Sequence, residues 1–304
     1  MPTGAWRYNE TARRQGLVGR GCPPYAYTFA QKKIMEYINV WFFGYLALGV
    51  AIGFFAGLLG VGGGAMMVPV LAILFPAQGF PFETKMQVIL ATSMATIMFT
   101  SISSVRAHQA RGAVNWPALW AMVPGILVGS LVGARVVKHM STAFLGIFFI
   151  CFLFYTATQM LINVKPKASR TLPGKFGMVA AGAVLGFLSA MVSVGGAFFT
   201  IPFMTWCNVP TITAIGTSAA LGFPIALFTT IANVFNGWDV ANVPQPSLGY
   251  VYLPALVGIS ITSMLVAPFG ARLAHRLPVQ TLKRIFAVLL YALGVRMLWG
   301  LLLA

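Results

Sequence analysis

The sequence predicts an all-α, polytopic membrane protein built from two homologous halves. Of its 304 residues, 59% are hydrophobic and only 8% are charged, so the chain is far more apolar than an ordinary soluble domain. Apolar runs close to the length of a membrane span recur from Ile38 onward, which excludes a soluble protein with a single anchor. A glycine-rich stretch from Gly53 to Leu71 also returns, in altered form, from Gly186 to Met204. The repeat predicts that the two halves share one architecture.

The order of segments along the chain predicts four regions. Residues 1–35 are polar and basic and lack the apolar core of a signal peptide, so we interpret them as a flexible or interfacial extension. A first transmembrane repeat over 36–163 and a second over 176–304 are joined by a basic linker at 164–175. Each half shows five apolar segments, at roughly 36–60, 64–77, 86–106, 116–138 and 141–163 in the first and 176–193, 197–209, 211–236, 248–272 and 279–303 in the second.

The second segment of each half is short and begins directly after a glycine cluster. At about 1.5 Å per residue, a dozen residues do not cross a hydrocarbon core about 30 Å thick. We therefore expect a half-helix or a re-entrant hairpin there. If this segment crosses the membrane fully, each half has five crossings and the repeat is inverted. If it does not, each half has four crossings and the repeat is parallel. The sequence leaves both topologies open.

The charge balance reflects membrane topology rather than nucleic-acid binding. Twenty Lys and Arg stand against four acids, for a formal charge of +16, and most of the basic residues lie in the tail and the loops. No nucleic-acid motif accompanies them. If each half has five crossings, the basic residues at 106–111, in the linker and at 272–284 favour a cytoplasmic placement of these loops, with both termini outside. The basic tail argues for the opposite orientation.

The glycine clusters predict a binding site for an anion. Adjacent glycines weaken a helix, and a break at membrane depth leaves backbone N–H and C=O groups unpaired unless it lines a wet cavity. The helix that follows points its free N–H groups and its positive end into that cavity. We expect the substrate to contact the glycines of both breaks: Gly62, Gly63, Gly64, Gly195 and Gly196. The alternative is that both glycine clusters are only tight interhelical turns. Gly125, Gly129 and Gly133, at four-residue spacing, are best interpreted as positions where two helices pack closely.

Hydroxyl side chains on the third segment of each half are expected to complete this site. Two pairs occur at corresponding places, Thr92 with Ser93 and Thr217 with Ser218, and their hydroxyls can donate hydrogen bonds to an oxyanion. Thr96, Thr100 and Thr229 lie on the same segments. Hydroxyls bonded to carbonyl groups of their own helix are the alternative.

The sequence offers little support for catalysis or for a bound metal. The three cysteines lie far apart, no HExxH or GxSxG pattern is present, and His108 lies in a basic loop, where we expect a solvated side chain. The four acids fall in the tail or near segment ends, which disfavours a proton relay within the membrane. We therefore expect no enzyme activity, no metal and no cofactor.

The motifs together resemble the TauE/SafE sulfite exporter family. The resemblance rests on the paired glycine blocks, the Ala-Thr-Ser and Gly-Thr-Ser elements, and the segments Arg106–Trp116 and Leu277–Phe286, and it covers about residues 40–303. It implies a permease of the cell inner (plasma) membrane for sulfite, organosulfonates or related anions. The partners it implies are a small anionic substrate and the lipid bilayer, with a homo-oligomer left open.

The chain departs from the family pattern at two positions. Ala197 stands where the first glycine block has Gly64, which indicates unequal halves. Asn115 stands where members of the family often carry an acid, and we interpret this position as structural.

Because export of an anion from an inside-negative cell is downhill by about 2.3 kcal/mol per charge per 100 mV, we favour uniport. A channel or permease for a different ion is the main alternative.

Overall fold

The computed structural model describes residues 24–59, 63–162, 170–240, 242–274 and 279–302. The chain divides into two compact units, Met1–Gly44 and Tyr45–Ala304. The predicted all-α, polytopic class is confirmed: the described residues form helices almost throughout. In order these are α2 (Pro24–Leu59), α3 (Gly64–Ala77), α4 (Lys85–Gln109), α5 (Trp116–His139), α6 (Thr142–Ile162), α7 (Lys175–Val192), α8 (Ala197–Trp206), α9 (Thr211–Asn236), α10 (Leu253–Ala274) and α11 (Val279–Leu302).

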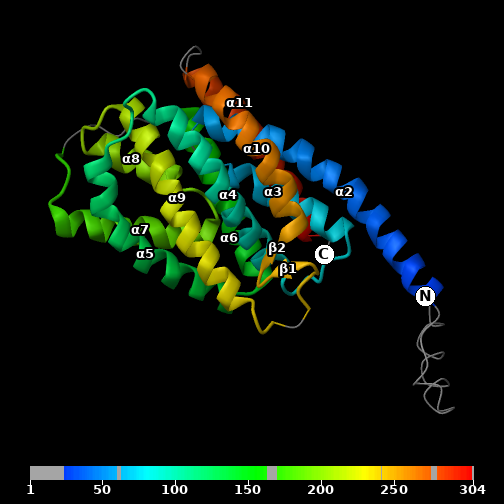
Figure 1. The fold of residues 1–304 in the computed structure, drawn as a ribbon. Coiled ribbons are helices and arrows are strands. Elements are labelled where there is room, and N and C mark those ends of the chain that lie inside the picture. Colours follow the sequence, from blue (N-terminus) through cyan, green and yellow to red (C-terminus); the bar gives the residue numbers. More distant parts are fainter. Residues whose placement is uncertain (1–23, 60–62, 163–169, 241, 275–278, 303–304) are drawn as a thin grey trace. The chain divides into compact units, whose positions relative to one another are not determined.

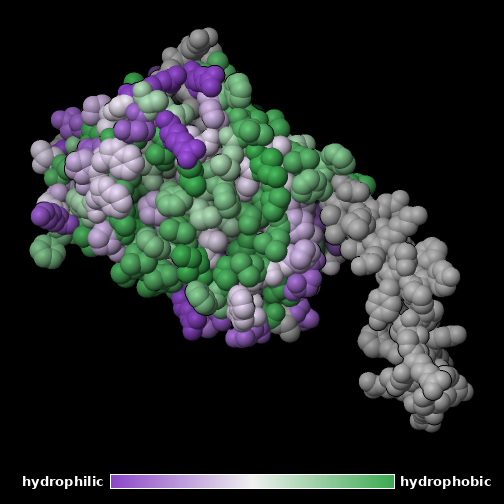
Figure 2. All heavy atoms as spheres, in the orientation of Figure 1, coloured by the Kyte–Doolittle hydropathy of each residue, from purple (hydrophilic) through white to green (hydrophobic). Residues whose placement is uncertain are grey.

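Within the described residues, eight helices are long and apolar enough to cross a bilayer, and α3 and α8 are the two shorter apolar helices. The apolar stretch of α2 that meets this criterion is Val40–Leu58, although the helix itself begins at Pro24, inside the predicted extension. Figure 2 shows a broad hydrophobic band across one face, with hydrophilic residues gathered at two opposite margins. This distribution is that of a multi-pass membrane protein whose outer surface faces lipid.

A two-stranded antiparallel ribbon interrupts the helices between α9 and α10. Strands β1 (Ser247–Leu248) and β2 (Val251–Tyr252) pair across Gly249, which has a φ of 56°. The sequence assigned residue 248 onward to a helix, and that expectation is wrong for the first few residues. The helix begins only at Leu253, directly before Pro254, because proline suits the first turn of a helix and a left-handed glycine does not.

Helices α4 and α9 form the centre of the bundle and lie side by side (Figure 1). In α4, 72% of the span is buried inside the protein, against 28% in α11, so α4 is central and α11 peripheral. Their loops show that the two central helices run antiparallel. The N–H of Tyr252, in the strand that follows α9, donates to Thr92 Oγ1 near the start of α4 at 3.0 Å. The N–H of Asn115, which follows α4, donates to Thr217 Oγ1 near the start of α9 at 2.9 Å.

Each glycine break joins two helices into a hairpin. Tyr45 Oη on α2 donates to Gln78 Oε1, just beyond α3, at 2.8 Å, so α3 returns toward the level from which α2 came. In the second hairpin, the N–H of Arg170, before α7, donates to the carbonyl oxygen of Trp206, at the end of α8, at 3.4 Å. Neither short helix therefore completes a crossing on its own.

The two hairpins enter the bundle from opposite ends of α9. The ring of Tyr45 lies 6.4 Å from that of Tyr252, beyond the C-terminal end of α9. Trp206 instead comes just before α9 begins at Thr211, and a helix of 26 residues is about 39 Å long. The closed ends of the hairpins meet inside the bundle, where a Cβ added to Gly64 would collide with the carbonyl oxygen of Ser193.

The glycines of α5 serve close packing, as the sequence indicated. A Cβ at Gly125 would collide with the backbone of Val179 on α7, and one at Gly129 with the backbone of Ala183. These two helices make the most extensive contact between helices of the described bundle. Their backbones approach closely because the contact positions carry no side chain.

Candidate functional site

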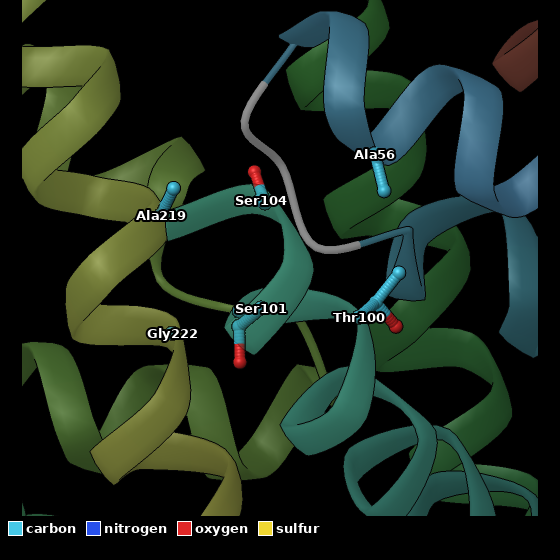
Figure 3. Close-up of a pocket in the computed structure, with 7 residues that line it drawn as sticks. Ala56, Thr100, Ser101, Ser104, Ala219 and Gly222 are labelled. Atoms are coloured by element: carbon cyan, nitrogen blue, oxygen red, sulfur yellow. The ribbon is translucent and has the colours of Figure 1, made fainter. Parts of the chain in front are cut away.

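A small cavity lies between α2, α4, α9 and the second glycine break. Figure 3 shows Thr100, Ser101 and Ser104 on α4, with Ala219 and Gly222 on the neighbouring α9. The lining residues are Ala56, Thr100, Ser101, Ser104, Gly195, Ala219 and Gly222. All the polar side chains of the cavity therefore come from one helix, and the other walls supply small residues and backbone.

The three hydroxyls of this cavity differ in their hydrogen bonds. Thr100 Oγ1 donates to the carbonyl oxygen of Thr96 at 2.7 Å, and Ser101 Oγ donates to that of Met98 at 3.0 Å. Ser104 is 4% exposed, and its hydroxyl has no hydrogen-bond partner within the described residues. Leaving a buried hydroxyl unpaired costs about 1–3 kcal/mol, so a ligand that accepts its hydrogen bond would recover that cost.

The second glycine break supplies backbone groups to the cavity wall. Ser193 ends α7 with φ 48° and ψ 46°, and Gly196 precedes α8 with φ 80° and ψ −17°, so two left-handed residues turn the chain within four positions. Gly195 lies between them and lines the cavity. Since α8 begins at Ala197, the free N–H groups and the positive end of its dipole lie at this break.

The electrostatics of the cavity favour a negative ligand. Glu83 and Asp239, the acids whose side chains the structure describes, are both exposed outside the helices. The cavity lies toward the C-terminal half of α4, and Arg106 and Arg111 are exposed at that end of the helix. Hydroxyl donors with no carboxylate beside them suit an anion rather than a cation.

The structure places the predicted glycines at the two hairpin turns. Gly62 lies outside the described residues. Gly63 precedes α3 with φ 79°, Gly64 begins that helix, and Gly196 repeats the conformation of Gly63 before α8. Among the predicted site residues that the structure describes, Gly195 is the one that lines the cavity. The role of the other glycines as ligands stays a prediction.

The four predicted hydroxyls make hydrogen bonds within the protein. Thr92 and Thr217 each accept an N–H from the loop that follows the other central helix. Ser93 Oγ donates to the carbonyl oxygen of Ser193 at 3.4 Å, and Ser218 Oγ donates to that of Ile215, on its own helix, at 2.8 Å. Only Ser218 bonds to its own helix, as the alternative expected, while the other three join distant segments. A ligand role for these residues stays a prediction.

Sequence reasoning missed Ser104, Ala219 and Gly222. Ser104 follows Thr100 and Ser101 by about one helical turn, so a polar stripe on one face of α4 was the signal that could have identified it. Ala219 and Gly222 carry no chemical signal. They contribute to the site only because the fold brings α9 against α4.

His108 lies one turn beyond Ser104, and the expectation of a solvated side chain there is wrong. The residue is 2% exposed. The chain after α4 folds back over the helix end, where the N–H groups of Arg111 and Ala113 donate to the carbonyl oxygen of His108 at 3.1 and 3.2 Å. Asn115 then caps α5 by accepting the N–H of Ala118 at 3.1 Å, which confirms its structural interpretation.

Comparisons with known proteins agree on one class. The family model described as "Sulfite exporter TauE/SafE" matches residues 45–297. A protein of Haemophilus influenzae named "Probable membrane transporter protein" is 33% identical over 253 residues, covering 83% of this chain and 96% of the relative. A probable membrane transporter protein of Methanocaldococcus jannaschii is 24% identical over 265 residues, covering 83% of this chain and 94% of the relative. No solved structure matches the chain.

Proposed function

The chain belongs to the sulfite exporter TauE/SafE family of membrane transporters, and from this premise we propose that it carries small sulfur-containing anions such as sulfite or organosulfonates across the cell inner (plasma) membrane. The observation that supports the substrate class is the lining of the small cavity at the second glycine break. It offers the unpaired hydroxyl of Ser104 and the backbone of Gly195, whereas the hydroxyls of Thr100 and Ser101 are bonded to their own helix. The oxygens of an oxyanion could accept the hydrogen bond that the Ser104 hydroxyl does not make within the described protein.

The same cavity would hold the anion without a charged side chain. The hydroxyl of Ser104 donates to one oxygen, and the first N–H groups of α8 stabilise the negative charge from the side of Gly195. Weak fixed charges suit a transporter, because a ligand that binds too tightly leaves slowly. Arg106 and Arg111, exposed near this end of α4, raise the local concentration of anions at the mouth.

Transport would follow by rocking two inverted halves, 36–163 and 176–304, against each other around this cavity. Two reciprocal features support an inverted repeat. The hairpins enter from opposite ends of α9, and Thr92 and Thr217 make equivalent contacts with the loops that follow α9 and α4. If the two inverted halves exchange conformations, the cavity opens first to one side of the membrane and then to the other.

Orientation and driving force complete the proposal. Arg111, Arg170 and Arg272 lie at the end of the bundle formed by the C-termini of α4 and α10 and the start of α7. By the positive-inside rule we place this end in the cytoplasm, so the cavity is reached from inside the cell. The membrane potential then drives export of the anion without a coupled ion.

A permease for another small anion is the second candidate. The lining of the cavity has hydroxyl and backbone groups but nothing that distinguishes sulfur from other oxyanion centres. The test is transport by the purified chain in liposomes, using labelled sulfite, an organosulfonate and sulfate side by side with empty liposomes. Saturable movement of sulfite or the sulfonate supports the proposal. Movement of sulfate alone favours the second candidate, and movement of none of the three contradicts both.

A further inference from the structure

The two hairpin turns have the same backbone but different surroundings. Gly63 and Gly196 precede α3 and α8 with nearly equal dihedral angles, φ 79° and ψ −8° against φ 80° and ψ −17°. A Cβ added to Gly63 would meet the apolar side chains of Ile52 and Ala56. A Cβ added to Gly196 would instead lie 3.5 Å from Thr200 Oγ1 and 3.7 Å from Ser189 Oγ. The second turn therefore faces two hydroxyls that the first turn lacks.

The sequence shows that these hydroxyls are not needed for the turn itself. When Gly63 is aligned with Gly196, Ser189 takes the position of Ala56 and Thr200 takes that of Met67. The first hairpin thus forms the same left-handed turn with an alanine and a methionine at these positions. Ser189 and Thr200 require another explanation.

Both hydroxyls are completely buried and unpaired. Ser189 and Thr200 are 0% exposed, and neither oxygen has a hydrogen-bond partner among the described residues. Thr205 on the same short helix behaves differently, since its Oγ1 donates to the carbonyl oxygen of Ile201 at 2.8 Å. Back-bonding to the helix is therefore available in α8, and Thr200 does not use it. Two buried, unpaired donors beside one glycine point to a ligand that accepts hydrogen bonds.

We propose that Ser189, Thr200 and the turn at Gly196 form a second oxyanion subsite, which the substrate occupies after or before the cavity during translocation. The inference rests on the proposed function. Gly195 lines the cavity and Gly196 faces the hydroxyl pair, so a single peptide unit separates the two places. Ile225 closes the subsite in this conformation, because its Cδ1 would lie 2.7 Å from a Cβ on Gly196. The subsite opens when α9 and the second hairpin move apart.

The chemistry of the subsite favours an anion over a cation. The N-terminal end of α8 adds a positive dipole to the two hydroxyl donors. The described carboxylates, Glu83 and Asp239, lie in loops and supply no negative charge here. A trapped water molecule would also satisfy two hydroxyls, and the experiment separates that structural role from a role in transport.

The test compares hydroxyl-deleting variants in the full chain reconstituted into liposomes, with labelled sulfite as the probe. Ser189→Ala and Thr200→Val, alone and together, remove the pair, whereas Thr200→Ser keeps a hydroxyl. Thr205→Val is the matched control, since it deletes a back-bonded hydroxyl on the same helix. Turnover and KM are measured per folded transporter, and sulfite binding is measured separately by thermal shift of the purified protein.

We expect the double variant to lose about tenfold or more in turnover, because hydrogen bonds to a charged ligand are lost during translocation, while its sulfite affinity changes less than about twofold. Thr200→Ser should restore part of the turnover that Thr200→Val loses, and Thr205→Val should keep wild-type turnover. Wild-type turnover of the double variant would overturn the subsite. So would a loss of thermal stability alone, which identifies the hydroxyls as holders of a structural water. If the wild-type chain itself neither binds nor transports sulfite, the proposed function fails and the subsite with it.

Discussion

The carbonyl oxygen of Ser193 occupies the space that a side chain at Gly64 would need. Ser193 belongs to the turn of the second hairpin, and Gly64 begins α3 in the first. The Ser193 hydroxyl also donates to the carbonyl oxygen of Leu90 at 2.8 Å. The two turns are thus fixed to each other and to α4 at one place in the interior.

Gly64→Ala should destabilise the protein. The new methyl group would collide with backbone rather than with a flexible side chain, and overpacking of this kind costs about 1–3 kcal/mol. Thermal unfolding of the detergent-solubilised protein measures the change. Gly300→Ala in α11 is the control, because a Cβ there meets nothing within 4 Å. Equal stability of the two variants would show that the turns do not touch as described.

Ser104→Ala should weaken binding of the transported anion. The substitution removes the unpaired hydroxyl of the cavity, and a hydrogen bond to a charged group is worth about 1.5–3 kcal/mol, so affinity for sulfite should fall about tenfold or more. Ser130→Ala is a matched control, since Ser130 is also buried and unpaired within the described residues but does not line the cavity. Binding is measured by thermal shift against sulfite concentration. An unchanged affinity in Ser104→Ala would remove this residue from the site.

Gly222→Ala should alter which anions pass. A Cβ at this position would lie 3.1 Å from the carbonyl oxygen of Gly195 and 3.6 Å from Ser101 Cβ, so it narrows the cavity with only small adjustments of its neighbours. We expect transport of an organosulfonate to fall more than transport of sulfite, because the sulfonate is bulkier. Competition between the two anions in liposomes gives the ratio. An unchanged ratio would place the selectivity of the transporter elsewhere.

Thr92→Val should reveal whether this threonine holds the fold or the substrate. Valine cannot accept the N–H of Tyr252, and an unpaired buried N–H costs about 1–3 kcal/mol. We expect a lower unfolding temperature with unchanged sulfite affinity, and Thr92→Ser should restore stability. Thr217→Val should repeat the result through Asn115. Loss of affinity at full stability would instead support the ligand role predicted from the sequence.

Transport should respond to the membrane potential. When the compartment that the cavity faces is electrically negative, movement of the anion out of that compartment is favoured by about 2.3 kcal/mol per charge per 100 mV. A potassium gradient with valinomycin sets the potential, and a pH gradient is imposed separately. We expect stimulation by the first and little effect of the second. Dependence on the proton gradient alone would contradict uniport.

The sequence predicted the helical membrane class, the short helices after the glycine clusters and the packing role of residues such as Gly125, because each leaves a local pattern. It predicted a cavity at the glycine breaks but not its full lining, since Ala219 and Gly222 become important only when α9 lies against α4. It also offered four or five crossings per half. In the structure the first and second segments form one hairpin, as the bond between Tyr45 and Gln78 shows, and three long helices follow. The number of crossings per half depends on contacts between distant segments, and such contacts produce no pattern in the local sequence.

The crossed contacts of the central helices set an order of events during synthesis. Asn115 precedes Thr217 by 102 residues, so the partner of this threonine has already been synthesised when α9 appears. Thr92 must wait for Tyr252, which is synthesised 160 residues later. Until then the start of α4 lacks one of its buried contacts, and the first half stays incomplete. A chain that ends before the ribbon therefore lacks the N–H that Thr92 accepts.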